Sequence, residues 1–323
     1  MAVIGLDLGG TKLSGGLFSE NGELLFKDSC KLEKRTGDDV GLLIQNFVKH
    51  LMNEATRLQI PIYAVGICVP GISYHETGCV WAPNIEGWEN YPLCEKIREV
   101  VNSDVKVVVD SDRACAILGE SWLGAAKGCA NVIFLAVGTG IGAGIIINNQ
   151  IVRGAHDIAG AIGWWALDTP FQQKFASCGC FEYHASGEGI AKVAREIIAN
   201  DKTYTGILRT KPADEITAHD VFSAYSAGDD VAIRTLRTAV TFWGMAVANL
   251  VSIFDPEKII FGGGVFDSAS QFIDDIYEEA KKHAQPISIR KVKLELSQLG
   301  SEAILVGAGY MALKTLKDTS CLA

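Results

Sequence analysis

The sequence predicts an α/β fold made of two domains of similar build. Three apolar strand patterns run directly into glycine-rich turns, at residues 7–12, 138–144 and 262–264. The short strands that open the chain are echoed by a second set from residue 132, and helical patterns separate the later strands. The chain has 323 residues, of which 48% are hydrophobic and 21% charged, so it holds enough core material for two domains.

The first half of the chain is predicted to open with a hairpin. Asn21 and Gly22 are a turn signal between two short apolar segments. A long helix follows, because Leu43, Phe47 and Leu51 recur on one face at helical spacing. The predicted elements are strands at residues 3–8, 13–18, 23–27, 63–69 and 105–109, and helices at about 39–58 and 114–124.

The second half repeats the strand–turn–strand opening, with Asn148 and Asn149 as a turn. Its longest helix is rich in alanine, leucine and valine and contains Trp243, so we expect that helix to be buried. No Pro- or Ser-rich linker separates the halves, and the boundary is predicted near residues 118–130. The predicted elements are strands at 132–137, 143–148, 151–152 and 255–261, and helices at 187–199, 218–227 and 229–253.

Composition excludes several classes of protein. The net charge of −9 argues against nucleic acid as a partner, because phosphate backbones need clustered Lys and Arg. No secretory signal precedes the first strand, and no apolar run reaches the roughly 20 residues of a membrane span. The nine cysteines are scattered within apolar segments, as expected of small buried side chains in a reducing compartment. We therefore expect a cytoplasmic protein with no membrane partner.

The three glycine turns predict an ATP site. Glycines after a buried strand let backbone N–H groups turn outward and approach an anion closely. Asp7 beside the first turn can hold Mg²⁺ directly or through water, while a structural alternative is that it stabilises the turn with Thr11. The expected phosphate contacts are Gly9, Gly10, Thr11, Lys12, Gly138, Thr139, Gly140, Gly262, Gly263 and Gly264.

Asp112 is the candidate catalytic residue. It lies where the apolar strand at 105–109 ends and a helix opens, the position at which active-site groups of α/β proteins collect. A carboxylate there can accept the proton of an attacking hydroxyl during phosphoryl transfer. The alternative is a helix N-cap, which Asp110, Ser111 or Asp112 could each supply. Asp110 is the better cap candidate if Asp112 is the base.

Together these motifs resemble the ROK family of repressors and sugar kinases, within the actin/hexokinase/Hsp70 ATPase superfamily. The resemblance implies two actin-like (ribonuclease H-like) domains flanking an ATP and substrate cleft, with Asp112 at the place of the base and Mg-ATP as phosphate donor. It places residues 1–118 and a C-terminal helix at about 303–323 in one domain, and residues 119–302 in the other. It is carried by residues 7–12, 82–88, 118–120 with Asp112, 138–144, 262–264, 300–303 and 306–309.

The chain departs from the family pattern around the sugar. Ser111 stands where these kinases usually carry Asn, and Ala161 and Trp164 stand at the usual Glu and His positions. The first two zinc cysteines are replaced within residues 173–175, and of the usual ligands only Cys180 is left. A tetrahedral zinc needs four N or S ligands, so no zinc site is expected.

The resemblance nevertheless supplies a set of candidate acceptor contacts. Trp164 either stacks on an apolar sugar face or an aglycone, or fills the space left by the lost zinc module. Glu182 is either a sugar contact or a surface carboxylate near a helix start. The candidate substrate contacts are Gly71, Asn84, Ser111, Asp112, Trp164 and Glu182.

We therefore expect ATP-dependent phosphorylation of a carbohydrate or polyol hydroxyl. Losing paired polar groups removes the means of selecting plain glucose, so a modified sugar, a glycoside or a polyol is expected as acceptor. The alternative is a non-catalytic, sugar-sensing regulator without a DNA-binding domain, since family repressors usually carry a helix-turn-helix before the first strand. Many family members are homodimers, and residues 241–254 could belong to such an interface or to a core.

Overall fold

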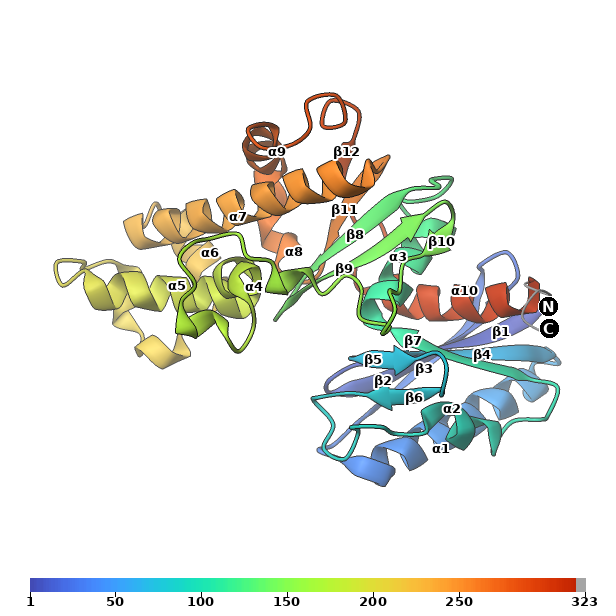
Figure 1. Ribbon diagram of the computed structural model, residues 1–323. Helices are drawn as coiled ribbons and strands as arrows, with labels where there is room; N and C mark the ends of the chain where they lie inside the picture. Colours follow the sequence, from blue (N-terminus) through green and yellow to red (C-terminus); the bar gives the residue numbers. More distant parts are fainter. Residues whose placement is uncertain (318–323) are drawn as a thin grey trace. The chain divides into compact units, whose positions relative to one another are not determined.

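The computed structural model describes residues 1–317, which form two compact units (Figure 1). Unit 1 comprises residues 1–128 and 151–159 together with the C-terminal part of the chain from 298. Unit 2 comprises residues 129–150 and 160–297. The last six residues of the C-terminal helix predicted at 303–323 lie outside the described part.

Unit 1 is built on a five-stranded sheet with the order β3-β2-β1-β4-β7. The first three strands are antiparallel neighbours, and β1, β4 and β7 are parallel. One face of the sheet packs on α1 (Gly37–Arg57) and α2 (Leu93–Arg98), where Ile4, Leu6 and Leu8 enter the core. The strands are β1 (Ala2–Leu8), β2 (Lys12–Ser19), β3 (Leu24–Lys31), β4 (Ile62–Val69) and β7 (Lys106–Ser111), with a separate pair β5 (Ile72–Tyr74) and β6 (Cys79–Trp81).

The other face of this sheet is covered by α3 (Asp112–Leu123) and α10 (Ala303–Lys317), which approach each other closely. A side chain on Gly119 would overlap the Ala303 carbonyl, and one on Gly307 would overlap the Cys115 carbonyl. The buried Glu120 carboxylate accepts the backbone N–H groups of Ala125 at 2.7 Å and Leu299 at 3.0 Å. The family-like motifs at 118–120 and 306–309 therefore serve packing within unit 1.

Unit 2 repeats the same plan, with the sheet order β10-β9-β8-β11-β12. Here β8 and β9 are antiparallel, and β8, β11 and β12 are parallel. The predicted duplication is thus confirmed in strand order. The strands are β8 (Val132–Val137), β9 (Ile141–Ile147), β10 (Gln150–Ile151), β11 (Lys258–Gly262) and β12 (Lys293–Leu296), and the helices are α4 (Cys180–Ala185), α5 (Gly187–Asn200), α6 (Ala218–Ser226), α7 (Asp230–Phe254), α8 (Phe266–Ala269) and α9 (Ile273–Lys281).

Helix α7 is the core helix of unit 2. By length and composition alone it is apolar enough to cross a membrane, which corrects the expectation that no segment of the chain passes this test. Within the structure 56% of its apolar window is buried, and Trp243 is fully enclosed and donates its indole N–H to the Ala185 carbonyl at 3.1 Å. The prediction that this helix is buried is confirmed.

Turn residues explain the hairpins. Asn148 and Asn149 have φ of 52° and 63°, and Gly22 has φ of 87°, values that suit tight hairpin turns. The eight cysteines among residues 1–317 are free thiols, and Cys68, Cys94, Cys115 and Cys180 are buried, as the sequence led us to expect.

Candidate functional site

In unit 1 the carboxyl ends of three parallel strands bring polar side chains to one edge of the sheet. Asp7 on β1 pairs with Cys68 on β4, and Cys68 pairs with Asp110 on β7. Because neighbouring residues in register point to the same face, Asp7 and Asp110 lie on the face covered by α3 and α10. Asp112 opens α3 directly after β7.

The Asp7 carboxyl is electrostatically unusual. Burial raises its pKa to about 6, and the negative charge of Asp112 adds to the effect. Lys12 opposes the shift and Glu302 reinforces it more weakly. A carboxyl that is hard to ionise beside a second carboxyl is a place where a cation is favoured.

Asp112 is accessible from solvent, with 48% of its side chain exposed. Protein atoms crowded around the carboxyl still raise its pKa by desolvation, while the Arg113 cation and backbone N–H groups lower it. One carboxylate oxygen accepts the Arg113 backbone N–H at 2.8 Å. An accessible carboxylate with a raised pKa is suited to accept a proton.

The N-cap of α3 is Ser111. Its hydroxyl accepts the backbone N–H of Ala114 at 3.4 Å. Ser111 was one of the three candidates, whereas Asp110, preferred if Asp112 is the base, is not the cap and accepts the Ser111 backbone N–H at 2.8 Å. The reason is that β7 runs two residues further than predicted and carries Asp110 within the sheet.

The first glycine turn joins β1 to β2. The Gly9 N–H bonds to the Lys12 carbonyl at 3.0 Å and closes the turn. Gly10 and Thr11 are exposed, and a side chain on Gly10 would meet no atom within 4 Å. The open side of this turn can therefore admit an anion.

The second and third glycine turns lie together in unit 2. The Gly187 N–H, at the start of α5, bonds to the Gly138 carbonyl at 2.8 Å. The Val265 N–H bonds to the Val137 carbonyl at 3.1 Å, so the turn after β11 sits against the end of β8. Gly263 has φ of 89°, and a side chain there would overlap the Val137 carbonyl. Glycine is required at this position.

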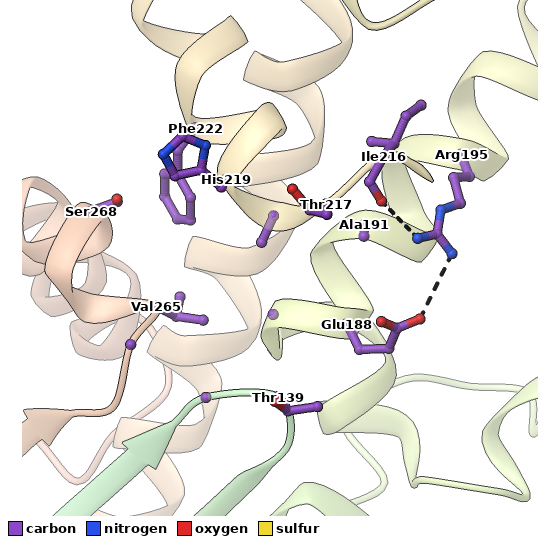
Figure 2. Close-up of a pocket in the computed structure, with 14 residues that line it drawn as sticks. Thr139, Glu188, Ala191, Arg195, Ile216, Thr217, His219, Phe222, Val265 and Ser268 are labelled. Atoms are coloured by element: carbon purple, nitrogen blue, oxygen red, sulfur yellow. Dashed lines mark hydrogen bonds and ion pairs between the residues drawn. The ribbon is translucent and has the colours of Figure 1, made fainter. Parts of the chain in front are cut away.

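These turns form one wall of a pocket in unit 2 with a volume of about 500 Å³. Figure 2 shows Thr139 at one side, His219 and Phe222 from α6 opposite, and Val265 and Ser268 from the third turn and α8. The Arg195 guanidinium donates to the Ile216 carbonyl at 2.7 Å and lies 3.7 Å from Glu188 (Figure 2).

The structure thus brings Gly138, Thr139 and Gly264 to one pocket in unit 2. Asp7, Gly9, Gly10, Thr11, Lys12 and Asp112 all belong to unit 1.

Glu182 lies in unit 2 beside the backbone of Gly163, the residue before Trp164. Glu182, on α4, accepts the Ile141 backbone N–H at 2.7 Å and thereby braces the turn at 138–140. Burial raises the pKa of its carboxyl. Trp164 is 59% exposed, and Gly179 must lack a side chain because its Cβ would overlap the Trp164 backbone. The indole therefore does not fill a buried space.

The remaining acceptor candidates belong to unit 1. Gly71 follows β4 and is packed under the Trp81 carbonyl, which leaves no room for a side chain. Asn84 is exposed at the tip of a loop. Trp88 closes that loop by donating its indole N–H to the Gly37 carbonyl at 3.0 Å.

The degenerate zinc segment is packed by aromatic side chains. The His184 ring stacks on Phe242 with centroids 4.1 Å apart, and its Nδ1 lies 2.9 Å from the Cys180 carbonyl. Cys178 has its Sγ 3.8 Å from the Gly179 carbonyl. Within residues 1–317 no group of three or more His, Cys, Asp or Glu side chains is arranged to hold a metal.

Sequence reasoning missed two sets of residues. Arg153 and Asp157 form a polar cluster with His75 and Asp110 in unit 1. No sequence motif indicated this cluster. The pocket wall at residues 216–222 was also missed. Its one local signal is the capping box of α6, in which Thr217 and Asp220 cap each other's backbone N–H groups.

Two units with one strand order, each with a glycine turn after its first strand, define the two-domain actin-like α/β fold. The ROK family pattern matches residues 3–315, so the chain belongs to the ROK family.

Relatives and solved structures of this family are similar over nearly the whole chain. A glucokinase of Halalkalibacterium halodurans is 31% identical over 318 residues, covering 95% of this chain and 94% of the relative. A xylose repressor of Caldicellulosiruptor bescii is 29% identical over 322 residues, covering 98% of this chain and 79% of the relative.

Two solved kinases share the fold at comparable sequence identity. The ROK hexokinase of Thermus thermophilus has a TM-score of 0.82 at 28% identity, covering 98% of this chain and 100% of that one. The ROK glucokinase of Streptomyces griseus, solved with glucose and AMPPNP, has a TM-score of 0.74 at 29% identity, covering 97% and 100%.

Proposed function

We propose that this protein is an ATP-dependent carbohydrate kinase in which Asp112 is the general base. The observation that carries the proposal is the pair of carboxylates, Asp7 and Asp112, coupled at the strand ends beside the first glycine turn. Membership of a family that includes glucokinases supports the reaction class.

ATP is assigned to the glycine turns and to the pocket in unit 2. A relative solved with glucose and AMPPNP supports both a nucleotide and a sugar as ligands. The pocket volume of about 500 Å³ suits a nucleoside, and its wall contains Thr139 and Gly264 from the turns assigned to phosphate. The start of α5 at Gly187 adds the positive end of a helix dipole beside this wall.

Mg²⁺ is proposed beside Asp7. The Asp7 carboxylate offers hard oxygen ligands, and the negative charge of Asp112 nearby adds to the attraction for a cation. Such a site fits a cation that takes its other ligands from phosphates and water. When bound, Mg²⁺ would neutralise the charge on the transferring phosphoryl group.

Asp112 performs the proton transfer in this proposal. Its carboxylate accepts the proton of the acceptor hydroxyl as that oxygen attacks the γ-phosphorus and the bond to ADP breaks. The accessible side chain allows contact with substrate, and the raised pKa brings the group nearer to neutral pH. Lys12 and the N–H groups of the first turn supply positive potential for the phosphates.

The acceptor is proposed to be a sugar derivative or glycoside and not plain glucose. Ala161 and Trp164 supply no carboxylate and no imidazole at positions where kinases of this family usually use them. An indole that is 59% exposed offers a flat apolar face to a sugar ring or an aglycone. Glu182 remains to accept a sugar hydroxyl hydrogen bond.

The proposal is tested by measuring ADP release from Mg-ATP against hexoses, amino sugars, β-glucosides and polyols. We expect acceptor-dependent turnover, fastest with a derivative that carries an apolar substituent. A second candidate is a sugar sensor, favoured by the altered acceptor residues and by the xylose repressor relative. Tight sugar binding without ADP release from any acceptor would support the sensor.

A further inference from the structure

The segment at residues 151–159 belongs to unit 1, although the chain on both sides of it belongs to unit 2. Inside unit 1 it is held by one apolar contact and two ion pairs. Ile151 packs against the apolar cluster of Cys68 and Cys115. Arg153 pairs with Asp110, and Asp157 pairs with His75.

Asp110 is the centre of this cluster. Its side chain is only 5% exposed, and both of its oxygens are engaged. One accepts the Ser111 backbone N–H at 2.8 Å, and the other accepts Nη2 of Arg153 at 2.6 Å. Nε2 of His75 lies 3.8 Å from that second oxygen. Arg153 is therefore the nearest cation to a buried carboxylate that holds the end of β7.

Arg153 is itself fixed in place. Its carbonyl accepts the Ala159 N–H at 2.9 Å, which closes the segment into a loop. Asp157 accepts the His75 backbone N–H at 3.0 Å and lies 3.2 Å from Nδ1 of its ring. The buried Nε of Arg153 has no hydrogen-bond partner within residues 1–317. Arg153 therefore binds Asp110 through Nη2.

We propose that Arg153 is a positioning residue for phosphoryl transfer, acting through Asp110 to hold the β7–α3 junction that carries Asp112. The chain of contacts runs from Arg153 to the Asp110 carboxylate, then to the Ser111 N–H. Ser111 caps α3, and Asp112 is the first residue of that helix. This inference rests on the proposed role of Asp112.

Removing the guanidinium would leave the Asp110 carboxylate buried without its charge partner, a costly state. The carboxylate would then rotate toward water, and its hydrogen bond to the Ser111 N–H would weaken. A misplacement of the base by about 1 Å can cost on the order of 100-fold in rate. Arg153→Ala should therefore lower kcat by about 10- to 100-fold. The KM for ATP should stay within about 3-fold, because the pocket in unit 2 is untouched.

The experiment compares kcat and KM for wild type, Arg153→Ala, Arg153→Lys and Arg57→Ala, with and without millimolar guanidinium against matched NaCl. Arg57 is the control because it forms an exposed ion pair with Glu54 in the same unit. We expect guanidinium to restore part of the kcat of Arg153→Ala only, Arg153→Lys to retain most activity, and Arg57→Ala to behave as wild type.

A wild-type kcat in Arg153→Ala would overturn the positioning role, as would a loss that neither Lys nor guanidinium relieves. If Arg153→Ala fails to fold, Arg153→Met combined with Asp110→Asn removes both charges. That variant should fold and still show the lowered kcat, and a wild-type kcat would contradict the inference. Asp112→Asn is measured beside these variants. Full activity in Asp112→Asn would refute the proposed base, whereas its loss with a normal Arg153→Ala would refute only the positioning role.

Discussion

Burial and, next to it, the negative charge of Asp112 hold the pKa of the Asp7 carboxyl at about 6, above its usual value of 3.8. Asp7 lies one residue before the end of β1, and Asp112 opens α3 more than 100 residues later. The proposed cation site and proton acceptor rest on this electrostatic coupling within unit 1.

The raised pKa of Asp7 predicts a stability change with pH. Between about pH 4 and pH 6 the folded protein keeps a proton that the unfolded chain has lost, so the free energy of unfolding falls as pH rises. Above about pH 6 the carboxyl is ionised in both states, so the free-energy cost of its burial no longer changes with pH. A difference of two pKa units corresponds to at most about 3 kcal/mol. Asp7→Asn should therefore raise the Tm of the ligand-free protein at pH 7, and this gain should vanish near pH 4.

Thermal unfolding across this pH range is the measurement, with Asp104→Asn as an exposed control in the same unit. Asp7→Asn should also lose the additional stabilisation that Mg-ATP gives the wild type. An unchanged or lowered Tm at pH 7 without ligand would contradict the electrostatic description of Asp7.

Two glycines of unit 2 should respond differently to alanine. Gly263 has a left-handed backbone and no room for a side chain, so Gly263→Ala should destabilise unit 2 by about 2 kcal/mol or more. A side chain on Gly138 would meet no protein atom within 4 Å. Gly138→Ala should therefore fold normally and raise the KM for ATP, since the methyl group would obstruct a phosphate. Denaturant unfolding and kinetics of both variants test this contrast.

The sequence predicted the strand–turn–strand segments that open each half because such segments depend on local patterns. Strands that end in glycine, and pairs such as Asn148-Asn149, are governed by backbone conformation within a few residues. The cluster around Arg153 could not be predicted in this way. It joins side chains from positions 75, 110, 153 and 157, and only the tertiary fold brings them together.

The N-cap of α3 shows the same limit of sequence-based prediction at the level of single residues. Asp110, Ser111 and Asp112 are all good capping residues, and their sequence alone does not say where β7 stops. Pairing with β4 carries β7 to Ser111 and so decides which of the three caps the helix.

Arg195 should affect nucleotide binding more than chemistry. Its guanidinium joins α5 to the Ile216 carbonyl at the pocket wall. Arg195→Met should raise the KM for ATP by about 3- to 30-fold, the loss of roughly one hydrogen bond from a charged donor, with kcat close to wild type. Arg237→Met, at an exposed position of α7 outside this pocket, is the matched control. A fall in kcat with an unchanged KM for ATP would contradict a role of Arg195 in nucleotide binding.

Trp164 should determine the acceptor. Because the side chain is 59% exposed, Trp164→Ala should change the free energy of unfolding by no more than about 0.5 kcal/mol. The KM for an acceptor with an apolar substituent should rise at least several-fold, while the KM for ATP stays constant. Phe171→Ala is the control, since Phe171 is 71% exposed in the same part of the chain. Equal effects of both variants on all acceptors would argue against stacking on Trp164.

The most direct test of the account is acceptor-dependent ADP release by Asp112→Asn, measured beside ATP binding by the same protein. The substitution keeps the shape of the side chain and removes its capacity to accept a proton. We predict that kcat falls by about 10²- to 10⁴-fold while the affinity for ATP is retained. Turnover at the wild-type rate in Asp112→Asn would contradict the assignment of Asp112 as the general base.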